Sequence, residues 1–189
     1  MMKKQKLDLF PTLVVVYDLS FLDLMLIYKN VSEIYSGPHG LIDNSNSSYG
    51  HDFSILYQDN LEFVKNKIDE CILDYVNTSG LQPISITGSW YSKMELGCRL
   101  HAHRHEGSVI SGVLYVDVDN NSVPLILKSP LMPYKMNDLY EKFDNPYASS
   151  GLSLKPTKGS LVLFPSWLEH ETHPEEGTRC IISFNTFYG

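Results

Sequence analysis

The spacing of apolar residues changes once along the chain, from helical periodicity before residue 82 to strand-like alternation after it. In the first part, apolar side chains recur three or four positions apart on one helical face, at Leu61, Val64, Ile68, Ile72 and Tyr75. Asp59 or Asn60 is a suitable N-cap, and Gly80 stands where a helix commonly ends in a left-handed residue. The pattern therefore predicts a helix that begins near Asn60 and ends before Gly80.

Three further segments precede this helix. Residues 8–17 are rich in β-branched side chains and predict a first strand. Apolar residues at near-helical spacing then predict a helix over about residues 20–35. Residues 37–52 are rich in Gly, Asn and Ser and predict a loop, in which His39 and His51 are expected to be solvated.

After residue 82 the chain consists of short strand-like runs separated by Gly, Pro, Asn and Asp. The runs are 84–94, 97–105, 108–118, 123–130, 152–157, 159–167 and 178–188. Seven or eight short strands without intervening helices predict a sandwich or a barrel, and residues 131–150 form a longer insertion expected to cover one of its openings. With no repeat or linker, a single domain over 1–189 is predicted, in which 1–80 support a core over 81–189.

The charge of the chain argues against nucleic acid as a partner. The net charge is −7 and the isoelectric point is about 5.4. Proteins that bind duplex DNA or RNA carry a basic patch, and here the lysines gather only at Lys3, Lys4 and Lys6. We expect no duplex nucleic acid ligand.

The cysteines and the N-terminal sequence both favour a cytoplasmic protein. Cys71, Cys98 and Cys180 are odd in number and lack CxxC spacing, which favours reduced thiols over a disulfide framework. Asp18 and Asp23 interrupt the apolar N-terminal stretch, so neither a signal peptide nor a membrane-spanning helix is predicted. We expect a protein of the cytoplasm, of a cell or of an infected cell, without a membrane partner.

Three of the seven histidines alternate before the predicted strand at 108–118, at positions 101, 103 and 105. In a strand, residues two apart point to the same face from Cα atoms about 6.6–6.8 Å apart, so two such imidazoles can meet on one metal ion. Residues four apart are about 13 Å apart, too far to share an ion bound at about 2.0–2.1 Å. The candidate pair is therefore His101 with His103, or His103 with His105.

A second group of candidate residues lies near the C-terminus. His170 follows a predicted strand, and Arg179 opens the last strand with Ser183 on the same face. The planar guanidinium of arginine binds a carboxylate through two parallel hydrogen bonds, and the hydroxyl of Ser183 can add a further donor. These residues predict a metal site beside a site for a dicarboxylic acid. Alternatively, Arg179 is a buried ion-pair partner of a carboxylate such as Glu106.

Four motifs in residues 84–187 carry a family resemblance. They are Gly97-x5-His103-x-His105, Ser108-x2-Ser-Gly-x2-Tyr115, Phe-Pro-Ser-Trp-Leu-x-His ending at His170, and Arg179-x3-Ser-Phe-Asn. In this order and spacing they resemble the Fe(II)/2-oxoglutarate-dependent oxygenase superfamily, and more narrowly its small bacterial and phage branch.

The resemblance implies a mainly β fold, the double-stranded β-helix or jelly roll, with the N-terminal helices packed on its outside. It implies Fe(II) as cofactor and 2-oxoglutarate as co-substrate. It also implies that O2 is used to hydroxylate a small-molecule or peptide substrate, with formation of succinate and CO2. The metal ligands that it implies are His103, His105 and His170. The residues that it implies for 2-oxoglutarate binding are Arg179, Ser183 and Tyr115.

The sequence departs from the superfamily at one ligand position. The usual site has two histidines and one carboxylate, whereas His105 stands at the carboxylate position. Two other functions therefore stay open: a three-histidine, cupin-like metalloenzyme that does not use 2-oxoglutarate, and a non-catalytic jelly-roll binding protein. Loops on a rigid scaffold usually set specificity, so substrate contacts are expected in residues 37–52 and 131–150.

Overall fold

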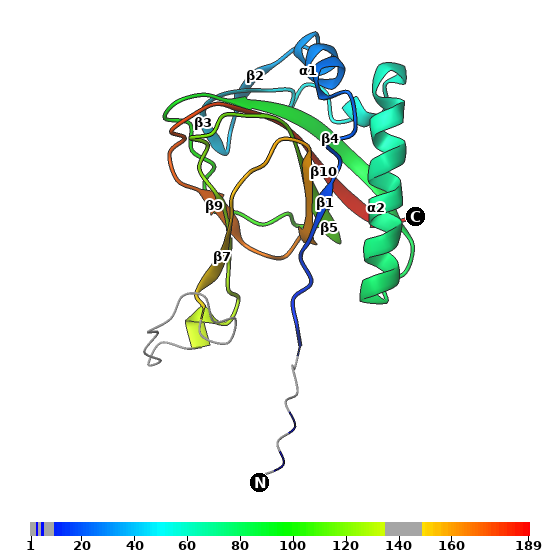
Figure 1. The fold of residues 1–189 in the computed structure, drawn as a ribbon, viewed down its shortest axis with the longest axis vertical. Coiled ribbons are helices and arrows are strands. Elements are labelled where there is room, and N and C mark those ends of the chain that lie inside the picture. The colour runs from blue at the N-terminus through cyan, green and yellow to red at the C-terminus, as the bar shows by residue number, and fades with distance from the viewer. Residues whose placement is uncertain (1–2, 4, 6–9, 135–148) are drawn as a thin grey trace.

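Two antiparallel sheets face each other in the computed structural model, which describes residues 3, 5, 10–134 and 149–189 (Figure 1). In this part of the chain the larger sheet has the order β1-β8-β5-β10-β4-β3-β2, and the smaller sheet has the order β7-β6-β9. The strands are β1 (Val15–Asp18), β2 (Gly37–His39), β3 (Ile42–Ser47), β4 (Ile84–Met94), β5 (Ile110–Val118), β6 (Leu125–Lys128), β7 (Gly151–Leu154), β8 (Ser160–Pro165), β9 (His170–Thr172) and β10 (Arg179–Tyr188).

The space between the sheets holds an apolar core. Successive residues of a strand point to opposite faces, so every second side chain of the central strands enters this space. Val113 of β5, Phe164 of β8 and Ile181 of β10 meet Leu125 and Leu127 of β6 there. The expected mainly β architecture is confirmed.

Two α-helices, α1 (Leu24–Ser32) and α2 (Glu62–Ser79), pack against the outer face of the larger sheet (Figure 1). A second apolar core joins them to the sheet, with Ile27 and Ile68 on the helices and Leu114 and Ile182 on the strands. The expected position of the helices is thus confirmed. No helix in the described ranges is long and apolar enough to span a membrane.

The predicted helix near residues 60–80 is confirmed, but the predicted cap is wrong, because Leu61 is the N-cap and no side chain caps the helix. A 3-10 turn, η2 (Asp59–Leu61), leads into α2, and the helix ends at Gly80 with a left-handed φ of 72°. The other predicted helix is shorter than expected, because Asp23 caps α1 by accepting a hydrogen bond from the backbone N–H of Leu26. Of the predicted first strand, β1 forms the end, and residues 8 and 9 lie outside the described residues.

Two predictions of local structure were wrong. Residues 97–105 are not a regular strand; within them only Leu100 and His103 form isolated bridges, and Gly97 starts the segment with a left-handed φ of 83°. Residues 37–52 are not simply a loop, because β2 and β3 form a hairpin on the edge of β4. There the hydroxyl of Ser47 donates to the carbonyl of Tyr91 at 2.7 Å, so a serine that suggested a loop joins the sheet.

Two further features complete the comparison with the predicted elements. The short strand β9 was not predicted, since it is only three residues long. The insertion at 131–150 contains a 3-10 turn, η3 (Met132–Tyr134), but its residues 135–148 lie outside the described part of the chain. The expectation that this insertion covers an opening stays a prediction.

Gly112 of β5 lies against Phe184 of β10, in the core between the larger sheet and the helices, where a larger residue would not fit. A Cβ atom at this position would lie 2.2 Å from Cζ of Phe184, whose side chain is completely buried. We expect Gly112→Ala to lower the free energy of unfolding by about 1–3 kcal/mol, because the ring must move within a packed core. Urea unfolding followed by circular dichroism measures the change.

Gly40→Ala provides the matched control for this prediction. A Cβ atom at Gly40 would have no neighbour within 4 Å, so its free energy of unfolding should change by about 0.5 kcal/mol or less. Equal effects of the two substitutions would contradict the assigned contact between Gly112 and Phe184.

Candidate metal centre

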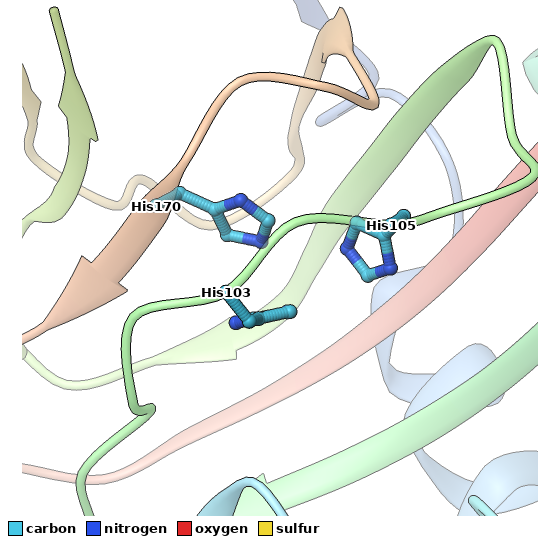
Figure 2. A group of neighbouring side chains, drawn as sticks. All are labelled: His103, His105 and His170. Atoms are coloured by element: carbon cyan, nitrogen blue, oxygen red, sulfur yellow. The ribbon is translucent and has the colours of Figure 1, made fainter. Parts of the chain in front are cut away.

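Three imidazoles converge at one end of the space between the sheets. His103, His105 and His170 each offer a nitrogen, and these nitrogens all lie within 4.8 Å of one another. Figure 2 shows His103 and His105 on one stretch of backbone and His170 on another, with the three side chains extending toward a common space. The ring centres of His103 and His170 are 4.2 Å apart, and that of His105 lies 4.9 Å from the first and 5.1 Å from the second.

Backbone hydrogen bonds bring these residues together across 67 positions of sequence. The N–H of His103 donates to the carbonyl of His170 at 3.1 Å, and the N–H of His170 donates back at 3.1 Å. Two residues later the N–H of His105 donates to the carbonyl of Ser166 at 3.0 Å. The irregular histidine segment is therefore attached to the turn between β8 and β9 rather than to a neighbour along a regular strand.

His101 lies outside the cluster. Its side chain is exposed, and its Nε2 lies 2.9 Å from Oδ2 of Asp43. Of the two pairs that the alternation allowed, the structure brings together His103 and His105 and directs His101 to the rim. The pairing agrees with the family resemblance, although the strand from which the geometric argument started is absent.

Hydrogen bonds to the backbone orient two of the three rings. Nδ1 of His103 lies 2.8 Å from the carbonyl oxygen of His101, and Nδ1 of His170 lies 3.0 Å from that of Leu168. A carbonyl can only accept, so each Nδ1 carries the proton and each Nε2 keeps its lone pair. This is the arrangement in which metal-bound histidines usually occur.

The third ring has a side-chain neighbour instead. Nδ1 of His105 lies 3.4 Å from the amide of Asn185, whose other end accepts a hydrogen bond from Ser111 at 2.8 Å. An amide can present either its oxygen or its nitrogen to this ring, so Asn185 can match either tautomer of His105.

Burial keeps the three imidazoles neutral. It lowers the pKa of His105 to about 3 and that of His170 to about 4, and the neighbouring histidines contribute because two cations would repel each other. The pKa of His103 is also lowered, again chiefly by burial. A neutral imidazole is the form that binds a metal ion, so the site is ready for a cation near neutral pH.

The histidines line a cavity of about 370 Å³. Every second residue of β10 from its first residue faces this cavity, as the alternation of the strand predicts: Arg179, Ile181, Ser183 and Asn185. Tyr115 of β5 lines the same space and is also buried in the core between the sheets. Burial raises the pKa of its phenol, which therefore stays protonated and able to donate a hydrogen bond.

Arg179 takes part in a buried ion pair. Its Nε lies 3.1 Å from Oε2 of Glu175, and both side chains are almost fully buried. Its Nη1 donates to the carbonyl of Val123 at 3.0 Å, while Nη2 has no hydrogen-bond partner in the described chain. The alternative prediction of a buried ion pair is thus correct in kind but wrong in the partner, because Glu106 is exposed. The guanidinium is held at the cavity with one nitrogen free.

The donor set suits a first-row transition metal. Imidazole nitrogens bind iron, nickel, copper and zinc, whereas calcium and magnesium prefer oxygen ligands. Within the described ranges no carboxylate joins the three imidazoles. The residues present therefore fit an iron ion, with a histidine in place of the usual carboxylate.

Several cavity residues were not predicted from the sequence. His39 was expected to be solvated, but it is buried and lines the cavity, so that expectation was wrong. Tyr49 and Phe53 line the cavity near it. Glu175 carried no sequence signal, because it lies in an acidic loop that is typical of a solvent-exposed surface.

Solved structures share this fold. HygX from Streptomyces hygroscopicus, with nickel and 2-oxoglutarate bound, is 13% identical, with 93% of this chain and 82% of that chain covered and a TM-score of 0.62. A prolyl-4-hydroxylase from Pseudomonas putida is 15% identical, with 93% of both chains covered and a TM-score of 0.60.

A prolyl hydroxylase from Trichoplax adhaerens, in complex with a peptide fragment of hypoxia inducible factor, is 13% identical. The match covers 92% of this chain and 83% of that chain with a TM-score of 0.63. These likenesses confirm the predicted jelly-roll fold.

A comparison of sequences shows the family to which the chain belongs. No curated protein matches the chain by sequence. A family profile described as "Putative 2OG-Fe(II) oxygenase" matches residues 88–185, slightly more than half of the chain. This range contains the three clustered histidines and Arg179. The predicted resemblance is confirmed, and the chain belongs to this family of 2OG-Fe(II) oxygenases.

Proposed function

We propose that the chain binds Fe(II) through His103, His105 and His170 and hydroxylates a small-molecule or peptide substrate, with 2-oxoglutarate as co-substrate. One observation carries the proposal: three neutral imidazoles and a buried arginine line the same cavity. The comparisons supply the family, whose name contains both iron and 2-oxoglutarate.

The histidines would act as the metal ligands. When bound, the metal supplies the position at which O2 and 2-oxoglutarate react. The chain itself contributes rigidity, because the Nδ1 hydrogen bonds of His103 and His170 fix both rings before any ion arrives. Fixed ligands lower the cost of binding and set the geometry of the open positions.

Arg179 would hold the distal carboxylate of 2-oxoglutarate. Its free Nη2 can donate to a carboxylate oxygen, and Ser183 and Tyr115 line the same cavity with hydroxyl donors. Hydrogen bonds from a charged donor to a carboxylate are stronger than neutral ones, and in a buried site water does not compete for them. Glu175 would keep the guanidinium in place while the cavity is empty.

One observation favours a second function: His105 completes a set of three histidines without a carboxylate. Three histidines without a carboxylate are a ligand set that also suits a cupin-like enzyme that does not use 2-oxoglutarate. The two functions differ in a direct experiment: Fe(II) and 2-oxoglutarate are added without oxygen, the absorption spectrum is recorded, and succinate is measured after O2 is admitted. Succinate supports the proposal, whereas iron binding without any change on adding 2-oxoglutarate favours the second function.

His103→Ala should lower the affinity for Fe(II) by at least ~100-fold, because even the loss of a residue that only supports a ligand costs about 10–100-fold. Isothermal titration calorimetry under anaerobic conditions measures the affinity. His101→Ala is the matched control, since His101 lies on the rim and should not affect iron binding. Equal affinities of the two variants would contradict the assigned site.

The stability of the metal-free protein should fall as the pH decreases from about 6.5 toward 4. The pKa of His39 and that of His170 are about 4 in the folded chain and that of His105 is about 3, against an ordinary value of 6.5. In this window the unfolded chain binds protons that the folded chain does not, so protons favour unfolding.

Urea unfolding at pH 7.5 and pH 5.0, with a chelator present, measures this pH dependence. His170→Gln should reduce the difference between the two pH values, whereas substitution of the exposed His173 by Gln should not. A difference that is identical in both variants would show that buried His170 is not among the groups responsible.

Removal of the Arg179 guanidinium should weaken the binding of 2-oxoglutarate while leaving the binding of Fe(II) intact. Arg179→Gln alone would leave the buried charge of Glu175 without a partner and lower the free energy of unfolding by about 3–5 kcal/mol. The variant to test is therefore Arg179→Gln combined with Glu175→Gln. Its affinity for 2-oxoglutarate should fall by at least ~10-fold, the worth of one charged hydrogen bond.

Calorimetric titration of the iron-loaded protein with 2-oxoglutarate, without oxygen, gives this affinity. Glu175→Gln is the matched control, because it makes the same change at Glu175 and keeps Arg179. Unaltered binding of 2-oxoglutarate by the double variant would exclude Arg179 as its anchor.

A further inference from the structure

Three aromatic side chains form a continuous wall of the cavity: Tyr49, Phe53 and Trp90, here called the aromatic wall. The ring centre of Tyr49 lies 4.7 Å from that of Phe53 and 5.2 Å from that of Trp90. Phe53 is 45% exposed, whereas Trp90 is only 5% exposed. The wall therefore extends from the surface into the interior.

The inner end of this wall lies beside the histidine cluster. The ring centre of Trp90 is 6.2 Å from that of His105. A flat group that packs on the wall would therefore have its inner edge close to the three imidazoles. Edge-to-face and offset contacts with aromatic rings favour ring-shaped partners, and such pairs add to the free energy gained from burial alone.

His39 provides a hydrogen-bond donor next to the aromatic wall. Its ring centre lies 4.3 Å from that of Tyr49, and the residue is 8% exposed and lines the cavity. The backbone N–H of Leu41 donates to its Nδ1 at 3.0 Å. A neutral imidazole that accepts at Nδ1 carries its proton on Nε2.

This arrangement also separates His39 from the metal ligands. Its Nδ1 lone pair is taken by Leu41, and its Nε2 bears a proton, so neither nitrogen is available to an ion. Nε2 has no hydrogen-bond partner in the described part of the chain, and His39 lines the cavity, so this N–H can donate to a molecule bound there. Burial lowers the pKa of His39 to about 4, which keeps this donor uncharged.

Arg179, whose Nη2 the proposed function assigns to 2-oxoglutarate, lies opposite Met94, four residues along β4 from Trp90. Its Nε contacts Glu175 at 3.1 Å. The other charged side chains of the cavity are paired or exposed. Arg104 contacts Glu169 at 3.4 Å. Glu106 is exposed, where a carboxylate is screened by water. A buried cation or anion beside the aromatic wall would therefore find no counter-charge among the described residues, which costs more than burying an uncharged group.

We propose that this surface is the substrate site, and that it takes an uncharged ring bearing a carbonyl oxygen, with the ring on the aromatic wall and the oxygen accepting from His39 Nε2. This inference rests on the proposed function, because it assigns the substrate class of the same cavity. It adds a role for His39 and for Tyr49, Phe53 and Trp90 beyond packing.

The test uses three probes of equal ring size: 4-fluorobenzamide, 4-fluorobenzylamine and 4-fluorobenzoate, titrated into the metal-free chain of residues 1–189 and followed by fluorine NMR. The amide should bind at least ~10-fold more tightly than the cation. It should exceed the anion by the same factor in the variant with Arg179→Gln and Glu175→Gln, which lacks the proposed carboxylate anchor. His39→Phe keeps a ring but removes the donor, and should weaken the amide roughly 5- to 10-fold. His39→Gln, which can accept from Leu41 and donate, should restore most of the affinity.

Two further variants keep the proposal testable if the interior substitutions unfold the chain. Phe53→Ala lies at the exposed end of the wall and should weaken all three probes. His101→Phe makes the same chemical change outside the cavity and should leave the amide affinity unchanged. Tighter binding of the amine than of the amide, or equal amide binding by His39→Phe and the unmodified protein, would overturn the proposal.

These titrations are independent of iron and 2-oxoglutarate. A chain that forms no succinate but still selects the amide would refute the proposed function and keep the substrate site. A chain that forms succinate but shows no selectivity would refute the substrate site and keep the proposed function.

Discussion

The candidate centre depends on one pair of backbone hydrogen bonds, between His103 and His170. These bonds join a segment without regular secondary structure to the first residue of β9. Their antiparallel geometry brings the two side chains to adjacent positions, with ring centres 4.2 Å apart. The bond from His105 to Ser166 then fixes the third ring. Because main-chain groups make these contacts, the position of the cluster is largely independent of neighbouring side chains.

The sequence predicted the elements whose residues follow a clear period. The helix ending at Gly80 and the long strands β4, β5 and β10 have regular apolar spacing and were placed within a few residues. It did not predict the hairpin of β2 and β3, because a polar hairpin at the edge of a sheet has the same amino-acid composition as a loop. Nor did it predict that residues 97–105 leave the strand conformation, since their alternation mimics one.

The candidate site shows the same division. His103, His105, His170, Arg179 and Ser183 could be found from motif spacing, and the structure brings all of them to one cavity. Glu175 and His39 could not be found, because each owes its position to tertiary contacts. Glu175 is buried by its contact with Arg179, and His39 by the hairpin that places it beside Tyr49. The spacing of residues in a single sequence does not reveal such tertiary contacts.

The buried carboxylate of Glu175 offers a physical reason why residue 105 is a histidine and not the usual carboxylate. A divalent metal and Arg179 would bring three positive charges into the cavity, and the 2-oxoglutarate dianion and Glu175 would bring three negative ones. With three neutral imidazoles the loaded cavity is then uncharged, whereas a carboxylate at residue 105 would leave one negative charge in excess. Uncompensated charge is costly in a water-poor interior. A neutral side chain at His105 and a buried acid at Glu175 are therefore mutually consistent features of this chain.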